Sequence, residues 1–194
     1  MSTLTQARTA PAARTRVVLL LTLLVAVVLG GTIWHFVSAH PKAPYTDPSA
    51  VGHLTICTAD GKAVTSGSTT QPLGAVVVSD AAAPAAYAGN GHTAALMVYQ
   101  PRKGVGPEEW TGLQLNAAAG YDSTDHPSTA LDAASTTIGQ FVRGYPAIDD
   151  GWLQLRLVLG ASGAAQGRAS YAAGDLHVDG TTWTLSDPGT APCP

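Results

Sequence analysis

The sequence predicts an all-β protein: an antiparallel immunoglobulin-like β-sandwich of seven or eight strands with one short helix, placed after an N-terminal transmembrane helix. Short apolar alternations separated by Gly, Pro, Asn and Asp begin near residue 51. Two Asp-Gly pairs stand between such alternations, as in tight hairpins. The Cys…Trp…Cys spacing of true immunoglobulin domains is absent, so the likeness concerns architecture alone, and a small β-barrel is the alternative.

An uninterrupted apolar run from Val17 to Phe36 predicts that residues 17–38 form a membrane-spanning signal anchor. About 20 residues, at a rise of about 1.5 Å each, cross the roughly 30 Å hydrocarbon core of a bilayer. The tail of residues 1–16 carries three arginines and no acidic residue. This bias predicts a single-pass protein of the cell membrane with a cytoplasmic N-terminus and an extracytoplasmic C-terminal domain.

Cleavage of the apolar run is the alternative. Val37-Ser38-Ala39 fits the small-residue rule for signal peptidase, and cleavage near Ala39 would release a secreted domain. The run exceeds the 7–15 residues usual for a signal-peptide core. Trp34 and Phe36 also match an aromatic belt at the membrane interface. The pattern therefore favours a retained anchor.

Residues 39–50 contain three prolines and predict an extended stalk between the membrane and an exported domain of residues 51–194. The first hairpin is expected around Asp60-Gly61 and the last around Asp179-Gly180. In residues 152–159, alternation places the leucines on one face and Gln154 and Arg156 on the other. Strands are predicted at residues 53–58, 62–65, 73–79, 93–100, 110–117, 152–159, 171–178 and 181–185.

One helix is expected, from about Thr136 to Arg143, with Ser135 as its N-cap and Gly144 at its end. It lies inside a long connection from residue 121 to residue 150. Connections of this length in compact domains are often functional. This segment is therefore the predicted partner surface.

The exported part carries seven Lys and Arg against all thirteen Asp and Glu, a formal charge of −6, with no basic stripe. Nucleic acid is thus not an expected partner, because neutralising phosphates requires clustered cations. Cys57 and Cys193 are the only cysteines, and neither has a Cys or His at metal-ligand spacing. In an oxidising compartment such a pair predicts one disulfide.

Residues 121–127 form the densest polar cluster, in which Asp122 and Asp125 are weak candidates for calcium ligands. The favoured interpretation is an Asx or Ser/Thr turn. No Gly-x-Ser-x-Gly, Ser-x-x-Lys or zinc-binding His motif is present, so no catalytic residue and no cofactor is predicted.

The composition, rich in Ala and Gly and poor in Lys, resembles that of high-GC bacteria. The leading expectation is a membrane-anchored binding or interaction protein of the bacterial cell envelope, with an envelope protein or a glycan as partner. One alternative is a secreted or surface hydrolase or carbohydrate-active module that uses Asp122, Asp125 and His126, together with Asp149 or Asp150. The other alternative is a structural envelope protein.

Overall fold

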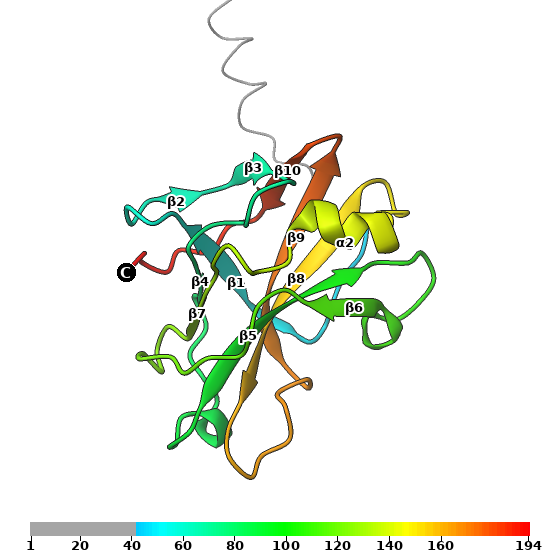
Figure 1. The fold of residues 1–194 in the computed structure, drawn as a ribbon. Helices are drawn as coiled ribbons and strands as arrows, with labels where there is room; N and C mark the ends of the chain where they lie inside the picture. Colours follow the sequence, from blue (N-terminus) through cyan, green and yellow to red (C-terminus); the bar gives the residue numbers. More distant parts are fainter. Residues whose placement is uncertain (1–41) are drawn as a thin grey trace, which may run out of the picture. The chain divides into compact units, whose positions relative to one another are not determined.

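The computed structural model of the chain describes residues 42–194 (Figure 1). The predicted cytoplasmic tail and transmembrane helix lie outside these residues. Within residues 42–194, no helix combines the length and hydrophobicity needed to cross a bilayer. The described part is mostly β, with one short α-helix and two single-turn 3₁₀ helices.

Ten strands form one mixed sheet, in the order β6-β5-β8-β9-β1-β4-β7, and β2, β3 and β10 join it at its sides. The strands are β1 (Ala50–Cys57), β2 (Ala63–Val64), β3 (Ser66–Ser68), β4 (Val76–Ser79), β5 (Thr93–Gln100), β6 (Thr111–Gln114), β7 (Ser128–Ala130), β8 (Trp152–Gly160), β9 (Tyr171–Asp179) and β10 (Thr182–Ser186). The helices are η1 (Ala85–Tyr87), η2 (Pro107–Glu109) and α2 (Ile138–Gly144). The all-β class with one short helix is thus confirmed.

Strand β1 connects the two halves of the sheet. Its first residues pair in parallel with β9, whereas Leu54–Cys57 pair antiparallel with β4. The sheet is therefore mixed, which corrects the expected purely antiparallel arrangement, and its ten strands exceed the expected seven or eight. The additional strands β3 and β7 have only three residues each, too few to show an alternation.

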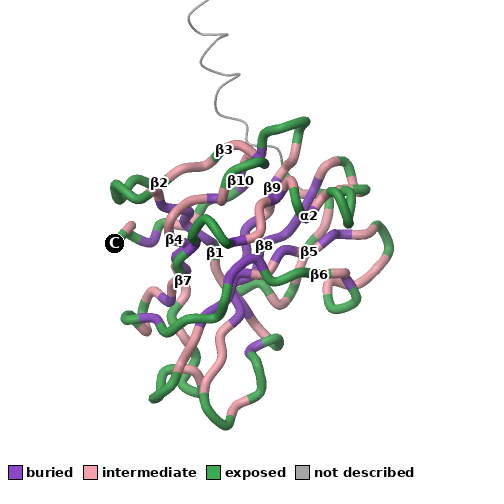
Figure 2. Tube along the Cα trace, in the orientation of Figure 1, coloured by how far each residue is buried: buried purple, intermediate pink, exposed green. Residues whose placement is uncertain are grey.

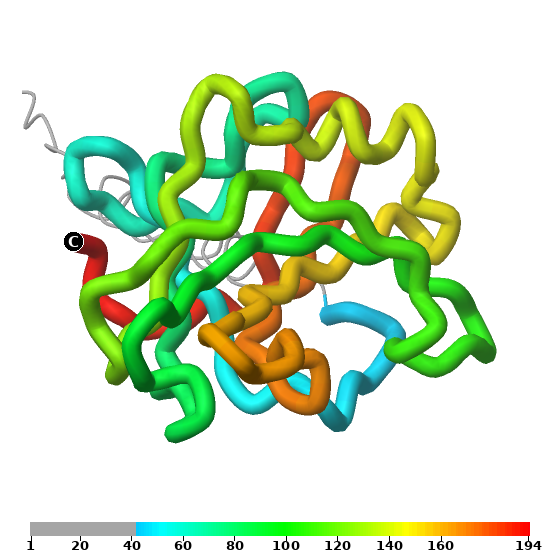
Figure 3. The backbone as a smooth tube through the Cα atoms, turned by 60° about the horizontal axis from the view of Figure 1, so that its bottom comes forward, coloured from blue at the N-terminus to red at the C-terminus, as the bar shows by residue number. Residues whose placement is uncertain are grey.

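The sheet curls so that β7 returns toward β5 (Figure 3). After β6 the chain continues beside β5, where Ala94 and Ala119 form an isolated bridge. The Asn116 side chain links β5 to β7. It accepts a hydrogen bond from Leu96 N and donates hydrogen bonds to Ala130 O and Thr129 Oγ1. One curled sheet thus encloses the interior. This arrangement is closer to a small β-barrel, the alternative architecture, than to a sandwich of two separate sheets.

Buried residues lie on strands from both halves of the sheet (Figure 2), and their apolar side chains form one core cluster. Leu153, Leu155 and Leu157 of β8 are at most 1% exposed, as their alternation predicts. Residues 121–150, the predicted partner surface, are mostly exposed or half-buried. Four of their side chains, those of Tyr121, Leu131, Ile138 and Phe141, belong to the core.

The hairpin turns agree with the predictions made from the sequence, and the helix cap differs from its prediction by two residues. Both Asp-Gly hairpins are present, pairing β1 with β2 and β9 with β10. Helix α2 is capped by Thr137, whose side chain accepts from Gln140 N while the Gln140 side chain accepts from Thr137 N. The hydroxyl of Ser135, the predicted N-cap, instead forms hydrogen bonds with the backbone N–H and the carboxylate of Asp132.

The Cys57–Cys193 disulfide is present, with a Cα–Cα distance of 5.7 Å and a sequence separation of 136 residues. It connects the end of β1 to the C-terminal tail. Cys57 is 1% exposed and packs with Val78 and Ala191 in a small cluster of its own. The predicted pairing is therefore confirmed, and it is consistent with an oxidising, extracytoplasmic location.

Candidate functional site

The outer face of β5, β8 and β9, opposite the leucine core, carries a buried polar and aromatic cluster. Strand register places Met97 beside Arg156 and Tyr99 beside Gln154. On the other side of β8, Asp175 lies beside Gln154. Alternation predicted that Gln154 and Arg156 lie on the face opposite the leucines, and there they are only 2% and 4% exposed. They lie on the predicted face, but other parts of the chain cover them.

Arg156 is the centre of this cluster. Its Nε donates to Gln154 Oε1 at 2.7 Å and its Nη2 donates to Pro107 O at 3.0 Å. The guanidinium lies over the rings of Tyr99 and Tyr171, at 4.0 and 4.5 Å from their centroids. Cation–π contacts are strongest for a desolvated cation. These contacts hold the guanidinium in one orientation.

The covering segment is residues 43–49, which we call the strap. It lies within the predicted stalk, and its side chains alternate between half-buried and exposed. Asp47 Oδ2 accepts from Tyr171 Oη at 2.7 Å and lies 3.4 Å from Arg156 Nη2. The side chains of Arg156 and Asp47 are 5% and 3% exposed, so this ion pair is almost fully desolvated. The strap therefore packs on the domain.

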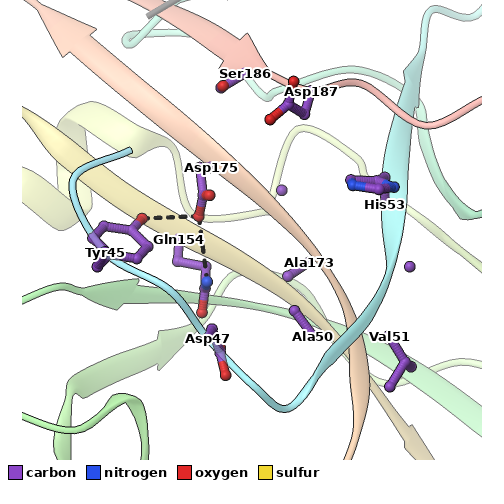
Figure 4. Close-up of a pocket in the computed structure, with 12 residues that line it drawn as sticks. Tyr45, Asp47, Ala50, Val51, His53, Gln154, Ala173, Asp175, Ser186 and Asp187 are labelled. Carbon is purple, nitrogen blue, oxygen red and sulfur yellow. Dashed lines mark hydrogen bonds between the residues drawn. The ribbon is translucent and has the colours of Figure 1, made fainter. Parts of the chain in front are cut away.

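Tyr45 forms the second contact of the strap (Figure 4). Its ring meets Trp110 edge-on at 4.8 Å, and its Oη donates to Asp175 Oδ1 at 2.8 Å. Gln154 Nε2 donates to the same carboxylate oxygen at 3.3 Å. Burial raises the pKa of Asp175 above its usual range, although these two hydrogen bonds oppose the shift. Burial and the nearby Asp175 charge raise the pKa of the Tyr45 phenol.

Three recesses surround the strap, and we name each by one lining residue. The Asp175 recess, of about 340 Å³, is bounded by Tyr45 and Asp175 at one end and by His53 and Asp187 elsewhere (Figure 4). The Arg156 recess, of about 300 Å³, is lined by Arg156, Arg168, Glu108 and aromatic and apolar side chains. The Lys103 recess, of about 200 Å³, lies between the strap and residues 102–107. Recesses of about 300 Å³ reach the lower size range of small-ligand sites.

Gly112 on β6 determines where the Tyr99 ring lies. A Cβ at position 112 would come within 2.5 Å of that ring. Gly112→Ala is therefore expected to lower the free energy of unfolding by about 1–3 kcal/mol, because Tyr99 is held from its other side by Arg156. Urea denaturation measures this loss. The control is Gly89→Ala, whose Cβ would meet no atom within 4 Å; equal losses for the two variants would contradict the prediction.

Replacing Asp175 tests the electrostatics of the cluster. Since the folded state raises the pKa of Asp175, this group contributes stability below its unfolded pKa of about 3.9, and the contribution is lost as pH rises through the folded pKa. Asp175→Asn keeps an oxygen that can accept from Tyr45 but cannot ionise. We expect its stability relative to the native protein to increase between pH 4 and pH 7.

Urea denaturation of both proteins at each pH measures this difference. Equal m-values show that the extent of unfolding is unchanged. A relative stability that stays constant or falls over this pH interval would contradict the assignment.

The residues proposed from sequence are spread over the domain. Asp122 and Asp125 are exposed, and His126 Nδ1 lies 3.2 Å from Ser79 O. Asp149 and Asp150 line the Lys103 recess, of which Asp122, Asp125 and His126 are not part. The described residues include no group of three or more His, Cys, Asp or Glu able to hold a metal ion. Trp183 belongs to the core cluster, whereas Trp110, although only 6% exposed, lines the Arg156 recess on the outer face.

Sequence reasoning missed the cluster itself. Asp47 and Arg156 are distant in the chain, and neither belongs to a motif. The one available signal was the alternation of Tyr45 and Asp47 between prolines in a segment expected to be a simple spacer. Comparison of the chain with protein-family models, curated proteins and solved structures found no match.

Proposed function

We propose that this chain is a membrane-anchored, extracytoplasmic binding protein of the bacterial cell envelope, and that its binding surface is the outer face of β5, β8 and β9. The supporting observation is the desolvated Arg156–Asp47 pair with recesses on either side of the strap. Removing two charges from water is costly, and small-ligand sites combine mostly apolar walls with a small number of fixed polar groups. The predicted anchor of residues 17–38 would hold the domain at the membrane.

The Cys57–Cys193 disulfide supports the extracytoplasmic location, because reducing conditions in the cytosol disfavour such a bond. A binding role accounts for the buried ion pair and the recesses of the outer face, and it requires no catalytic residues. In the part of the chain that the structure describes, no hydrogen bond links a Ser, Thr or Cys side chain to a histidine ring. The hydrolase alternative gains no specific support, since its residues occupy separate places.

The location is tested by the N-terminal residue and the mass of native protein from fractionated cells, with and without reduction. We expect Met1 in the membrane fraction and a mass lower by two hydrogen atoms before reduction. Protease added to intact cells should digest the C-terminal domain. A new N-terminus at His40 in the culture medium would overturn the anchor and leave a secreted domain.

The binding surface is tested by a photo-reactive amino acid placed in the full-length protein in cells. Lys103 is exposed and lines the Lys103 recess beside the strap, whereas Lys62 is exposed on the β1–β2 hairpin. A discrete cross-linked product from position 103, absent from position 62, is the expected result. Equal products from both positions, or none from position 103, would contradict this assignment of the surface.

A further inference from the structure

We propose that the Arg156 recess binds a monoanionic carboxylate carried on a small ring, such as an acidic sugar. This inference deepens the proposed binding function and rests on it. It gives the outer face a ligand class that follows from the unused hydrogen-bonding capacity of Arg156 and from the charges around the recess.

Arg156 retains donors that the protein does not use. Its Nε and Nη2 have the partners described above, but among residues 42–194 Nη1 has none. This nitrogen is also not sealed in the interior, since it is not one of the buried unpaired atoms of the described chain. Arg156 lines the recess and its side chain is 5% exposed, so we assign the unpaired N–H groups of Nη1 to a ligand in that recess.

The same guanidinium already binds a carboxylate from its other side. Asp47 lies 3.4 Å from Nη2, and the rings of Tyr99 and Tyr171 keep the guanidinium plane fixed. Arginine forms strong charge-assisted hydrogen bonds with planar carboxylates when its orientation is preset. A ligand would therefore meet a donor that needs no reorganisation.

The charges and the walls narrow the ligand further. Arg156 and Arg168 supply two positive charges, and Glu108 in the lining and Asp47 behind Arg156 supply two negative ones, so the charges around the recess balance. A ligand with one negative charge therefore adds less repulsion than a doubly charged phosphate. Apart from Ser49, the remaining lining is aromatic and apolar. Its members are Met97, Tyr99, Trp110, Gly112, Val158 and Tyr171. Such walls suit a ring with apolar faces and polar edges.

The test uses full-length, oxidised protein in detergent and four probes: D-glucuronate, its neutral counterpart D-glucose, benzoate and inorganic phosphate. Isothermal titration is expected to show glucuronate binding at least about tenfold more tightly than glucose, the ratio given by one charge-assisted interaction. Benzoate distinguishes a sugar ring from an aromatic ring as the carrier of the carboxylate. Phosphate binding as tight as glucuronate, or no difference between glucuronate and glucose, would overturn the proposal.

Matched variants locate the binding. Arg168→Gln should weaken glucuronate binding about threefold to tenfold, whereas Arg143→Gln, at an exposed arginine on α2 that lines no described recess, should leave it unchanged. Because Arg156→Lys can destabilise the fold, ¹⁵N-arginine NMR of the native protein provides a second measurement. Glucuronate should shift the Arg156 guanidinium signals and leave those of Arg143 in place.

The two proposals can fail separately. If no carboxylate binds but the photo-reactive residue at position 103 still gives its specific product, the ligand class is wrong and the binding surface stands. If carboxylate binding is unaffected by Arg168→Gln and the Arg156 signals do not shift, the recess is not the site. If no carboxylate probe binds and position 103 gives no specific cross-linked product, both proposals are overturned.

Discussion

Loss of the Cys57–Cys193 disulfide is expected to lower the free energy of unfolding by about 4–5 kcal/mol. The bond closes a loop of more than one hundred residues, and a chain without it gains conformational entropy when it unfolds. Domains of this kind have a total stability of about 5–15 kcal/mol. The double variant Cys57→Ala/Cys193→Ala should therefore lose a large share of its stability and unfold at a temperature about 10–15 °C lower.

The control separates the cross-link from the packing of the sulfur atoms. Reduction of the native protein breaks the bond but retains both side chains, including the buried Cys57. If loop closure dominates, reduced protein and double variant should lose similar amounts in urea denaturation. A loss below about 1 kcal/mol in the reduced protein would show that the tail contributes little to holding β1.

Features set by neighbouring residues could be predicted from the sequence. Asp60-Gly61 and Asp179-Gly180 lie in tight hairpins because glycine adopts the positive φ values of 73° and 56° found there. The leucines of β8 face the core because side chains alternate along a strand. Helix α2 was placed within two residues, although its cap moved to Thr137, which forms a reciprocal pair with Gln140.

Features that join distant parts of the chain could not be predicted. The parallel pairing of β1 with β9 connects segments from opposite ends of the domain, and no local pattern encodes it. The alternation in β8 correctly assigned Gln154 and Arg156 to the face opposite the leucines. It could not show that this face is covered, because the covering residues come from the strap and from Pro107. The candidate site was missed for this reason.

Removal of Asp47 is expected to cost about as much stability as loss of the disulfide. Asp47→Ala leaves the guanidinium of Arg156 buried without its counter-charge and leaves the Tyr171 hydroxyl without its acceptor. Breaking one side of a buried ion pair typically costs about 3–5 kcal/mol. Urea denaturation of the full-length protein measures the loss. An exposed pair is the control: Lys62→Ala removes the contact with Asp60, and no resolvable change is expected.

A double-mutant cycle tests whether the loss comes from the pair itself. Arg156→Met replaces the guanidinium with an apolar side chain, so Asp47→Ala should cost much less in that background. Additive losses would mean that Asp47 acts through the strap backbone and not through Arg156. The cycle also bears on recognition, because the charge that orients Arg156 toward its recess comes from the segment leading to the predicted anchor. If the pair is coupled, loss of Asp47 is expected to change the orientation of the Arg156 guanidinium and with it the shape of the Arg156 recess.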